Sequence, residues 1–219
     1  MAGPPEPPRP LGAPQKKAQD FAAVRDWPGY FRVVQGKPPR ETLILALEKF
    51  EAEGKRAGTA VDLGCGEGRD AAELLRRGWT VHAIDSHPAA FEYLRARVGQ
   101  TERPRLITLQ ADFADATWPR VDLVNASFAL PFCPPEDFGA LWGRIVESLP
   151  RGGRFAGQLF GDRDTWAALP DRSHQTRAQA EALLRPFDVE RFDEEEKDDN
   201  DARGVPKHWQ VFHIVARKR

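Results

Sequence analysis

The sequence predicts a doubly wound α/β fold, in which a seven-stranded, mostly parallel sheet is closed by a C-terminal antiparallel hairpin. From residue 58 onward, short apolar runs alternate with helical patterns, a rhythm typical of parallel strands joined by crossover helices. The last two strand-like runs, FDVERF and HWQVFHIVARK, have no helix between them and therefore must pair antiparallel. No repeat of fixed period occurs, which excludes solenoids and propellers.

Three regions are expected along the chain. Residues 1–14, rich in proline, form a disordered tail, for which a polyproline ligand of a partner domain is the alternative. Residues 15–57 form a helical cap: QKKAQDFAAVRDWPGYFRVV is typical of a helix interrupted by an aromatic turn. In the following ETLILALEKFEAEG, Leu43, Leu47 and Phe50 share one face of an amphipathic helix. Residues 58–219 form the main domain.

The elements of the main domain follow in order. Strands are predicted at 58–64, 80–85, 105–110 and 121–128. A helix at 70–78 precedes the second of these strands, and a helix at 89–98 precedes the third. A helix at 136–149 leads to a fifth strand at 152–160, and another helix covers 175–184. The hairpin strands at 187–192 and 208–218 are joined by an acidic connector. Its DEEEKDD run indicates a solvated loop, with a cation-selective gate as the alternative.

Composition excludes several functional classes. The 219 residues are 41% apolar and 30% charged, which suits a globular protein, and the net charge of −1 gives no general attraction to nucleic acid or anionic membranes. Cys65 and Cys133 form no paired metal spacing, so we expect no metal site and a reducing environment. No apolar run approaches about 18 residues and no signal peptide is visible, so we expect a cytoplasmic protein without a membrane partner.

The turn after the first strand, VDLGCGEGRD, is the strongest functional signal. Its glycines let a ligand approach the backbone closely, and the following helix directs free N–H groups toward that ligand. The dinucleotide fingerprint places two residues between its second and third glycines. Here one residue separates each of Gly64, Gly66 and Gly68, and Asp62 lies inside the turn, so the pyrophosphate pattern is not matched.

The segment Asp62-Leu63-Gly64-Cys65-Gly66-Glu67-Gly68 resembles the first motif of the class I S-adenosylmethionine-dependent methyltransferases. The resemblance covers roughly residues 58–217 and implies a Rossmann-like methyltransferase fold, S-adenosylmethionine as cofactor and S-adenosylhomocysteine as product. In that family the second strand ends in an acid that binds the ribose hydroxyls, here Asp85. The third is followed by an acid near the adenine amino group, here Asp112, with Phe113 beside the ring. The cofactor residues thus expected are Asp62, Gly64, Cys65, Gly66, Gly68, Arg69, Asp85, Ser86, Asp112, Phe113, Asn125 and Trp27.

These residue types suit that chemistry. A carboxylate such as that of Asp85 accepts two hydrogen bonds from a vicinal diol, and Asp112 can accept one from an exocyclic amine. Asp62 can act on the cationic sulfonium through its field or bind the ligand's ammonium. The structural alternatives are that Asp62 only fixes the turn and that Asp85 only caps the helix at SHPAA.

Within the family, CGEGRDAAELLRRGWTVHAIDSHPAAFEYL looks closest to the tellurite-resistance and thiopurine or thiol S-methyltransferases, and Arg69 is shared with the tellurite-resistance type. This resemblance implies a small-molecule acceptor, with a thiol or a chalcogen oxyanion as the expected nucleophile. The segment after Asn125 lacks the two prolines of methyltransferases that act on nucleobases or glutamine, and no nucleic-acid partner is expected. The alternative is a non-catalytic S-adenosylmethionine-binding or scaffold protein with the same fold.

No catalytic base stands out from the sequence. The sulfonium is already an activated electrophile, so the main task is to align the nucleophile and exclude water. If the acceptor is an alcohol or an amine, Ser127, Arg163 or His208 would have to manage its proton. For the substrate we expect Trp27, Tyr30 and Phe128, with the first two forming a lid; ordinary core packing is the alternative for that pair.

Overall fold

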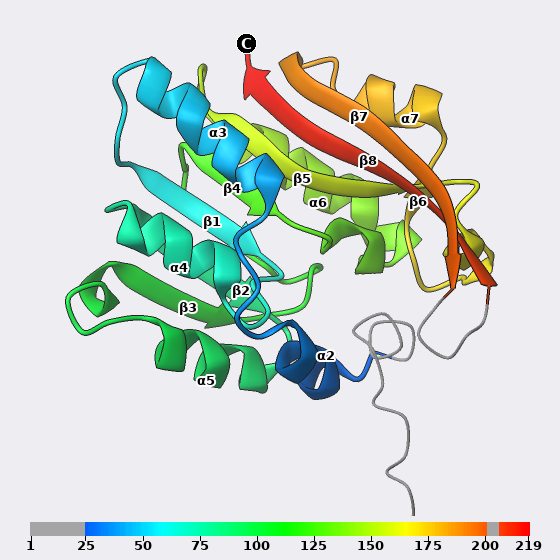
Figure 1. The fold of residues 1–219 in the computed structure, drawn as a ribbon. Coiled ribbons are helices and arrows are strands. Elements are labelled where there is room, and N and C mark those ends of the chain that lie inside the picture. The colour runs from blue at the N-terminus through cyan, green and yellow to red at the C-terminus, as the bar shows by residue number, and fades with distance from the viewer. Residues whose placement is uncertain (1–24, 201–205) are drawn as a thin grey trace, which may run out of the picture.

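A twisted sheet runs through the middle of the molecule (Figure 1). The computed structural model describes residues 25–200 and 206–219, so the predicted tail and the first part of the cap lie outside the described residues. The strand order is β3-β2-β1-β4-β5-β8-β7, with the two-residue β6 paired to β5 beside this path. β1 to β5 run parallel, whereas β8 is antiparallel to both β5 and β7. The predicted doubly wound fold with its C-terminal antiparallel hairpin is confirmed.

The elements have the following bounds. The strands are β1 Thr59–Leu63, β2 Thr80–Asp85, β3 Leu106–Gln110, β4 Leu123–Ala126, β5 Arg154–Gly161, β6 His174–Gln175, β7 Phe187–Asn200 and β8 Pro206–Lys218. The α-helices are α2 Trp27–Val34, α3 Glu41–Ala52, α4 Arg69–Arg76, α5 Pro88–Arg97, α6 Pro135–Ser148 and α7 Arg177–Leu183. No helix within residues 25–200 and 206–219 is long and apolar enough to cross a membrane.

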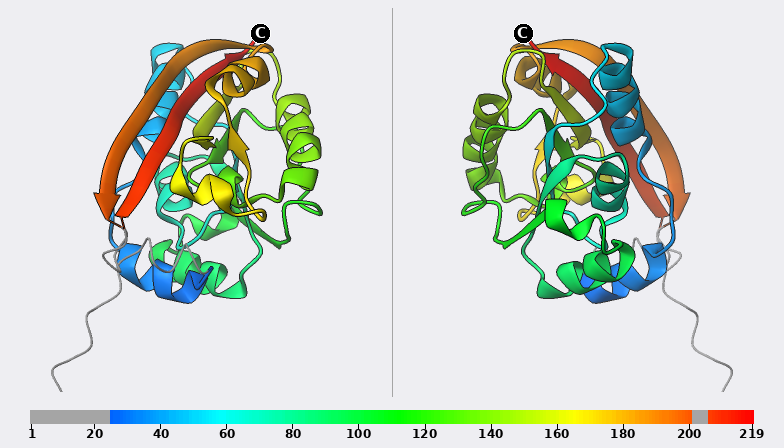
Figure 2. Two further views of the ribbon diagram at one scale, coloured as in Figure 1. Left: turned by 90° about the vertical axis from the view of Figure 1, so that its right-hand side faces the viewer. Right: turned by 90° about the vertical axis from the view of Figure 1, so that its left-hand side faces the viewer.

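Helices cover both faces of the sheet (Figure 2). On one face α3, α4 and α5 pack on the small strand residues Ala60, Ala83 and Ala156, and the predicted α3 stripe of Leu43, Leu47 and Phe50 is buried there. On the other face α6 and α7 pack on larger strand residues. Alternate residues of each strand point to opposite faces, so both faces of the parallel strands carry a core.

The aromatic stretch before α3 forms a helix rather than an interrupting turn. Trp27 begins α2, Pro28 occupies its first turn, and the Asp26 side chain accepts a hydrogen bond of 3.0 Å from the Gly29 N–H. Proline fits this position because its missing N–H would be unpaired there in any case. The buried side chains of Phe31 and Val34 anchor α2.

The acidic run predicted as a loop is part of a strand. β7 continues through the DEEEKDD segment, and its charges are paired: Glu194 binds Arg163 and Arg177, while Glu195 binds Lys197. These pairs offset the repulsion between neighbouring carboxylates along the strand. The last helix also begins later than predicted, because Gln175 belongs to β6 and Thr176 caps α7.

Candidate functional site

A cavity of about 990 Å³ opens at the carboxyl ends of β1, β2 and β4. It is bounded by α2, the segment before α3, the glycine turn, the loops after β3 and β4, and the β7–β8 ribbon. This is the edge at which open parallel sheets bind ligands, and the volume suits a small-molecule site.

The glycine turn forms the wall after β1. Gly64 and Gly66 have φ angles of +70° and +53°, which side chains rarely adopt. A Cβ atom on Gly64 would lie 2.5 Å from the Cβ of Ala129, so the turn and the loop after β4 can meet only at a glycine. Cys65 within the turn is buried, and burial raises the pKa of its thiol well above the ordinary value.

Asp85 joins the end of β2 to this turn. Its carboxylate accepts hydrogen bonds from the N–H of Gly66 at 2.9 Å and from the N–H of His87 at 2.8 Å. The helix that follows is capped by His87, whose Nδ1 accepts from the Ala89 N–H at 3.2 Å, so Asp85 is not the helix cap. Burial raises the pKa of Asp85 against the opposing effect of these backbone hydrogen bonds. Ser86, Asp112 and Phe113 line the same side of the cavity.

A buried cluster of acids lies behind the turn. Nδ2 of Asn125 donates to Asp62 at 2.8 Å and to Asp70 at 3.1 Å, and the Arg40 N–H donates to Asp70 at 2.9 Å. Oδ2 of Asp62 is buried without a hydrogen-bond partner. Burial, followed by the charge of Asp70, raises the pKa of Asp62 to about 8. A buried acceptor of this kind is costly unless a donor reaches it, so the cavity wall fits a cationic donor group.

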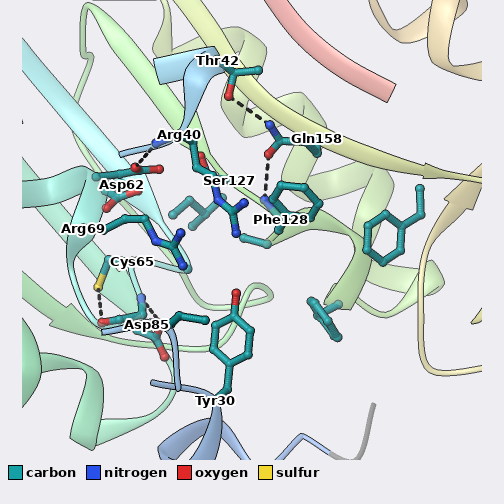
Figure 3. Close-up of a pocket in the computed structure, with 18 of the residues that line it drawn as sticks. Tyr30, Arg40, Thr42, Asp62, Cys65, Arg69, Asp85, Ser127, Phe128 and Gln158 are labelled. Carbon is teal, nitrogen blue, oxygen red and sulfur yellow. Dashed lines mark hydrogen bonds between the residues drawn. The ribbon is translucent and has the colours of Figure 1, made fainter. Parts of the chain in front are cut away.

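Side chains of Arg40, Arg69 and Tyr30 point into the same cavity (Figure 3). Nε of Arg69 donates to Glu67 at 2.9 Å, and its side chain is buried rather than solvated. The guanidinium carbon of Arg40 lies 4.3 Å from the centre of the Phe128 ring, and no carboxylate of the described residues is within ion-pair distance of it. Burial, followed by the charge of Arg69, lowers the pKa of Arg40. The pair therefore favours an anionic group in the cavity.

The side of the cavity toward β5 and β8 is mainly aromatic. Phe128 has a φ angle of +54°, and its N–H donates to Oε1 of Gln158 at 3.0 Å. Gln158 in turn donates to Oγ1 of Thr42 at 3.0 Å, which ties the loop after β4 to α3 (Figure 3). The aromatic rings that line this side are Trp27, Tyr30, Phe128, Phe132, Phe160, Trp166 and Trp209.

The structure separates the three candidate proton carriers. Ser127 lines the cavity, and its Oγ donates to Asn125 at 3.2 Å. Arg163 and His208 do not line it: Arg163 binds Glu194 and Glu196, and His208 binds Glu196 and Asp198. Asn125 also lies behind the cavity wall, where it holds the two acids.

Sequence reasoning missed Arg40, Gln158 and His213, which all line the cavity. Arg40 follows the PP pair just before a helix, and this position beside an expected cofactor site was its only local signal. Gln158 and His213 face each other in the β5–β8 register, which no local pattern reveals.

The chain resembles known methyltransferases in sequence and in fold. Residues 60–153 match the model of a methyltransferase domain. Trans-aconitate 2-methyltransferase of Deinococcus radiodurans is 31% identical over 136 residues, which are 61% of this chain and 48% of that protein. The chain thus spans about half the length of this curated relative.

Solved structures share the fold at low identity. TehB from Haemophilus influenzae superposes with a TM-score of 0.70 and 17% identity, over 87% of this chain and 66% of that chain. The 1,6-didemethyltoxoflavin-N1-methyltransferase of Burkholderia thailandensis was crystallised with 1,6-didemethyltoxoflavin and S-adenosylhomocysteine. It superposes with a TM-score of 0.58 and 23% identity, over 96% of this chain and 92% of that chain. The N-methyltransferase NodS from Bradyrhizobium japonicum WM9 superposes with a TM-score of 0.62 and 16% identity, over 82% of this chain and 95% of that chain. The chain therefore shares its fold with these methyltransferases, and residues 60–153 match the model of a methyltransferase domain.

Proposed function

We propose that the protein is an S-adenosylmethionine-dependent methyltransferase that moves a methyl group to a small-molecule acceptor by in-line displacement. The observation that carries this proposal is the convergence of the glycine turn, the unpartnered oxygen of Asp62 and the carboxylate of Asp85 on one cavity. The methyltransferase-domain match over residues 60–153 supports it.

The residues present fit the cofactor. Asp85 would accept from the ribose hydroxyls, since each of its oxygens has a lone pair beyond the one used by the backbone. Asp112 and Phe113 would hold the adenine. Asp62 would bind the ammonium of the amino-acid portion, and Arg40 and Arg69 its carboxylate.

When bound, the cofactor supplies a methyl group on a cationic sulfur. The chain's own residues align the acceptor and exclude water, which is the role that we assign to Trp27, Tyr30 and Phe128. A thiol and a chalcogen oxyanion remain the acceptors predicted from the sequence, and both belong in the first acceptor panel. A cytoplasmic location without nucleic-acid or membrane partners likewise remains a prediction from composition.

The proposal is tested by calorimetric titration with S-adenosylhomocysteine and by release of labelled S-adenosylhomocysteine from labelled cofactor with a panel of amines, hydroxyl compounds, thiols and tellurite. We expect binding by the wild type and a strong loss of affinity in Asp85→Ala. Asp115→Ala, also on the cavity wall but in the exposed loop after β3, is the matched control.

Equal affinity of a folded Asp85→Ala and the wild type would contradict the cofactor assignment. Tight binding without turnover of any acceptor would instead favour the non-catalytic cofactor-binding protein.

A further inference from the structure

One imidazole lines the cavity on its aromatic side. His213 lies on β8, opposite Gln158 of β5 and Asp193 of β7 in the sheet register. Its ring centre is 6.1 Å from that of Phe128, in an edge-to-face arrangement. It thus lies beside the loop that meets the glycine turn at Ala129, on the side where the acceptor is expected.

The other four histidines do not line the cavity. His87 caps α5, and both ring nitrogens of His208 contact carboxylates, those of Asp198 and Glu196. His82 and His174 are half-buried elsewhere. His213 is therefore the one imidazole of the chain that an acceptor in this cavity can reach.

A carboxylate sets the orientation of His213. Nε2 lies 3.0 Å from Oε2 of Glu195, whose other oxygen is 2.6 Å from Nζ of Lys197. The hydrogen bond from Lys197, followed by that of His213, lowers the pKa of Glu195, so this carboxylate is charged and accepts the Nε2 proton. Nδ1 has no hydrogen bond within the described chain and keeps its lone pair. This is the pattern in which a carboxylate fixes the tautomer of a general base.

We propose that His213 is the catalytic proton acceptor for an acceptor whose nucleophilic nitrogen or oxygen carries a proton, and that Glu195 is its positioning residue. The proposal rests on the proposed methyltransferase function and specifies its acceptor class. The nucleophile's lone pair forms the new bond to the methyl carbon while the methyl–sulfur bond breaks and leaves its electron pair on sulfur. The proton of the nucleophile passes to Nδ1, and the resulting imidazolium pairs with Glu195 until the proton leaves to water.

The charged surroundings of His213 permit this role. On β7 the neighbouring charges are those of Asp193, Glu195 and Lys197, and each acid is paired: Asp193 binds Arg191 at 2.6 Å. From the segment before α3, the guanidinium of Arg40 lies over the Phe128 ring, and β5 contributes the neutral Gln158. Glu195 is thus the one carboxylate that binds the imidazole.

The test compares His213→Asn with His208→Gln, which removes the other histidine–carboxylate contact outside the cavity. Methyl transfer from labelled cofactor is measured with phenethylamine, catechol, thiophenol and tellurite across neutral pH. For the amine or the hydroxyl probe we expect a loss of about 10²–10⁴-fold in His213→Asn, typical of a lost general base, and no loss in His208→Gln. Glu195→Gln should lower kcat more than it changes KM and should shift the acidic limb of the pH profile.

Affinity for S-adenosylhomocysteine should be the same in all these variants, which separates this inference from the cofactor assignment. Equal turnover of a folded His213→Asn and the wild type would overturn it, as would a wild type that methylates only thiophenol or tellurite, or none of the four probes. Nitrogen NMR of the wild type gives a second measure that needs no variant: the Nε2–H tautomer of His213 is expected, and the Nδ1–H tautomer would contradict the proposal.

Discussion

At the scale of single residues, Asp62 carries the sharpest electrostatic consequence. Its buried carboxyl has a pKa raised from 3.8 to about 8 by burial and by Asp70, so near neutral pH the folded protein without ligand holds a proton there. An ammonium group placed against its unpartnered oxygen favours the charged form. Binding of the cofactor's amino-acid portion must therefore expel this proton.

We predict that binding of S-adenosylhomocysteine near pH 7 releases up to about one proton, and that affinity rises with pH until the pKa of about 8 is passed. Below that pH the proton must leave before the ion pair forms; above it the carboxylate is already charged. Calorimetry in buffers of different ionisation enthalpy measures the released proton. Asp62→Asn should bind more weakly and release none, and equal proton release from this variant and the wild type would contradict the prediction.

The residues of the site differ in how far sequence could predict them. Asp62, Gly64, Gly66 and Asp85 lie at or just after strand ends, and the structure places them around one cavity. Gly68, also predicted to hold the cofactor, instead caps α4 beside Leu94 and does not line the cavity. Arg163 and His208 were chosen because they lie near strand ends, but they pair with the acids of β7 away from the cavity. His213 could not be predicted because its place depends on the register of two strands that lie far apart in the sequence.

At the scale of elements, α2 has two sides with different roles. Phe31 and Val34 are 2% exposed, and the Phe31 ring lies 5.8 Å from that of Tyr93 on α5. All four side chains line the cavity, but Trp27 and Tyr30 are only half-buried. The buried pair anchors the helix and the half-buried pair is more open to ligands, so the predicted lid remains a prediction that variants of these two pairs can test.

We predict that the double variant Trp27→Ala with Tyr30→Ala loses most of its turnover but little of its free energy of unfolding, because these rings shield the transferred methyl group. Phe31→Ala, the matched control on the same helix, should cost about 3–5 kcal/mol, as truncation of a buried phenylalanine does. Thermal melts give the stabilities, and limited proteolysis shows whether cofactor protects α2. Similar losses of stability in both variants, with no protection by cofactor, would favour simple core packing.

The elements also show where local pattern stops predicting the fold. The strands and helices from β1 to α6 follow from apolar runs and periodicity, because each buries a face that its own residues define. β7 does not, since its acidic half is held by partners that come from other elements, such as Arg163 and Arg177. The acidic run therefore forms a strand through pairing with other elements, although its composition is typical of a solvated loop.

At the scale of the whole molecule, one arginine joins the cap to the C-terminal ribbon. Arg154 on β5 is fully buried, and its guanidinium donates to Glu190 of β7 at 2.8 and 2.9 Å. It also donates to Glu53 at the end of α3, at 2.6 and 3.1 Å, and lies 4.4 Å from the Phe50 ring centre. Burial alone would lower the pKa of Arg154, but the hydrogen bonds with Glu190 and Glu53 outweigh it and raise the pKa. None of these residues lines the cavity.

We predict that Arg154→Ala lowers the free energy of unfolding by about 3–5 kcal/mol, because it leaves the mostly buried Glu190 without its partner. Arg76→Ala is the matched control: it breaks an ion pair with Glu73 in which the arginine is largely exposed, and should cost far less, because solvent screens an exposed pair. Urea denaturation measures both. The folded Arg154→Ala protein should still bind S-adenosylhomocysteine with wild-type affinity, since the joint between cap and ribbon lies outside the cavity. Equal costs for the two variants would show that α3 and β7 are held together by their apolar contacts instead, and a loss of affinity at unchanged stability would place the joint within the ligand site.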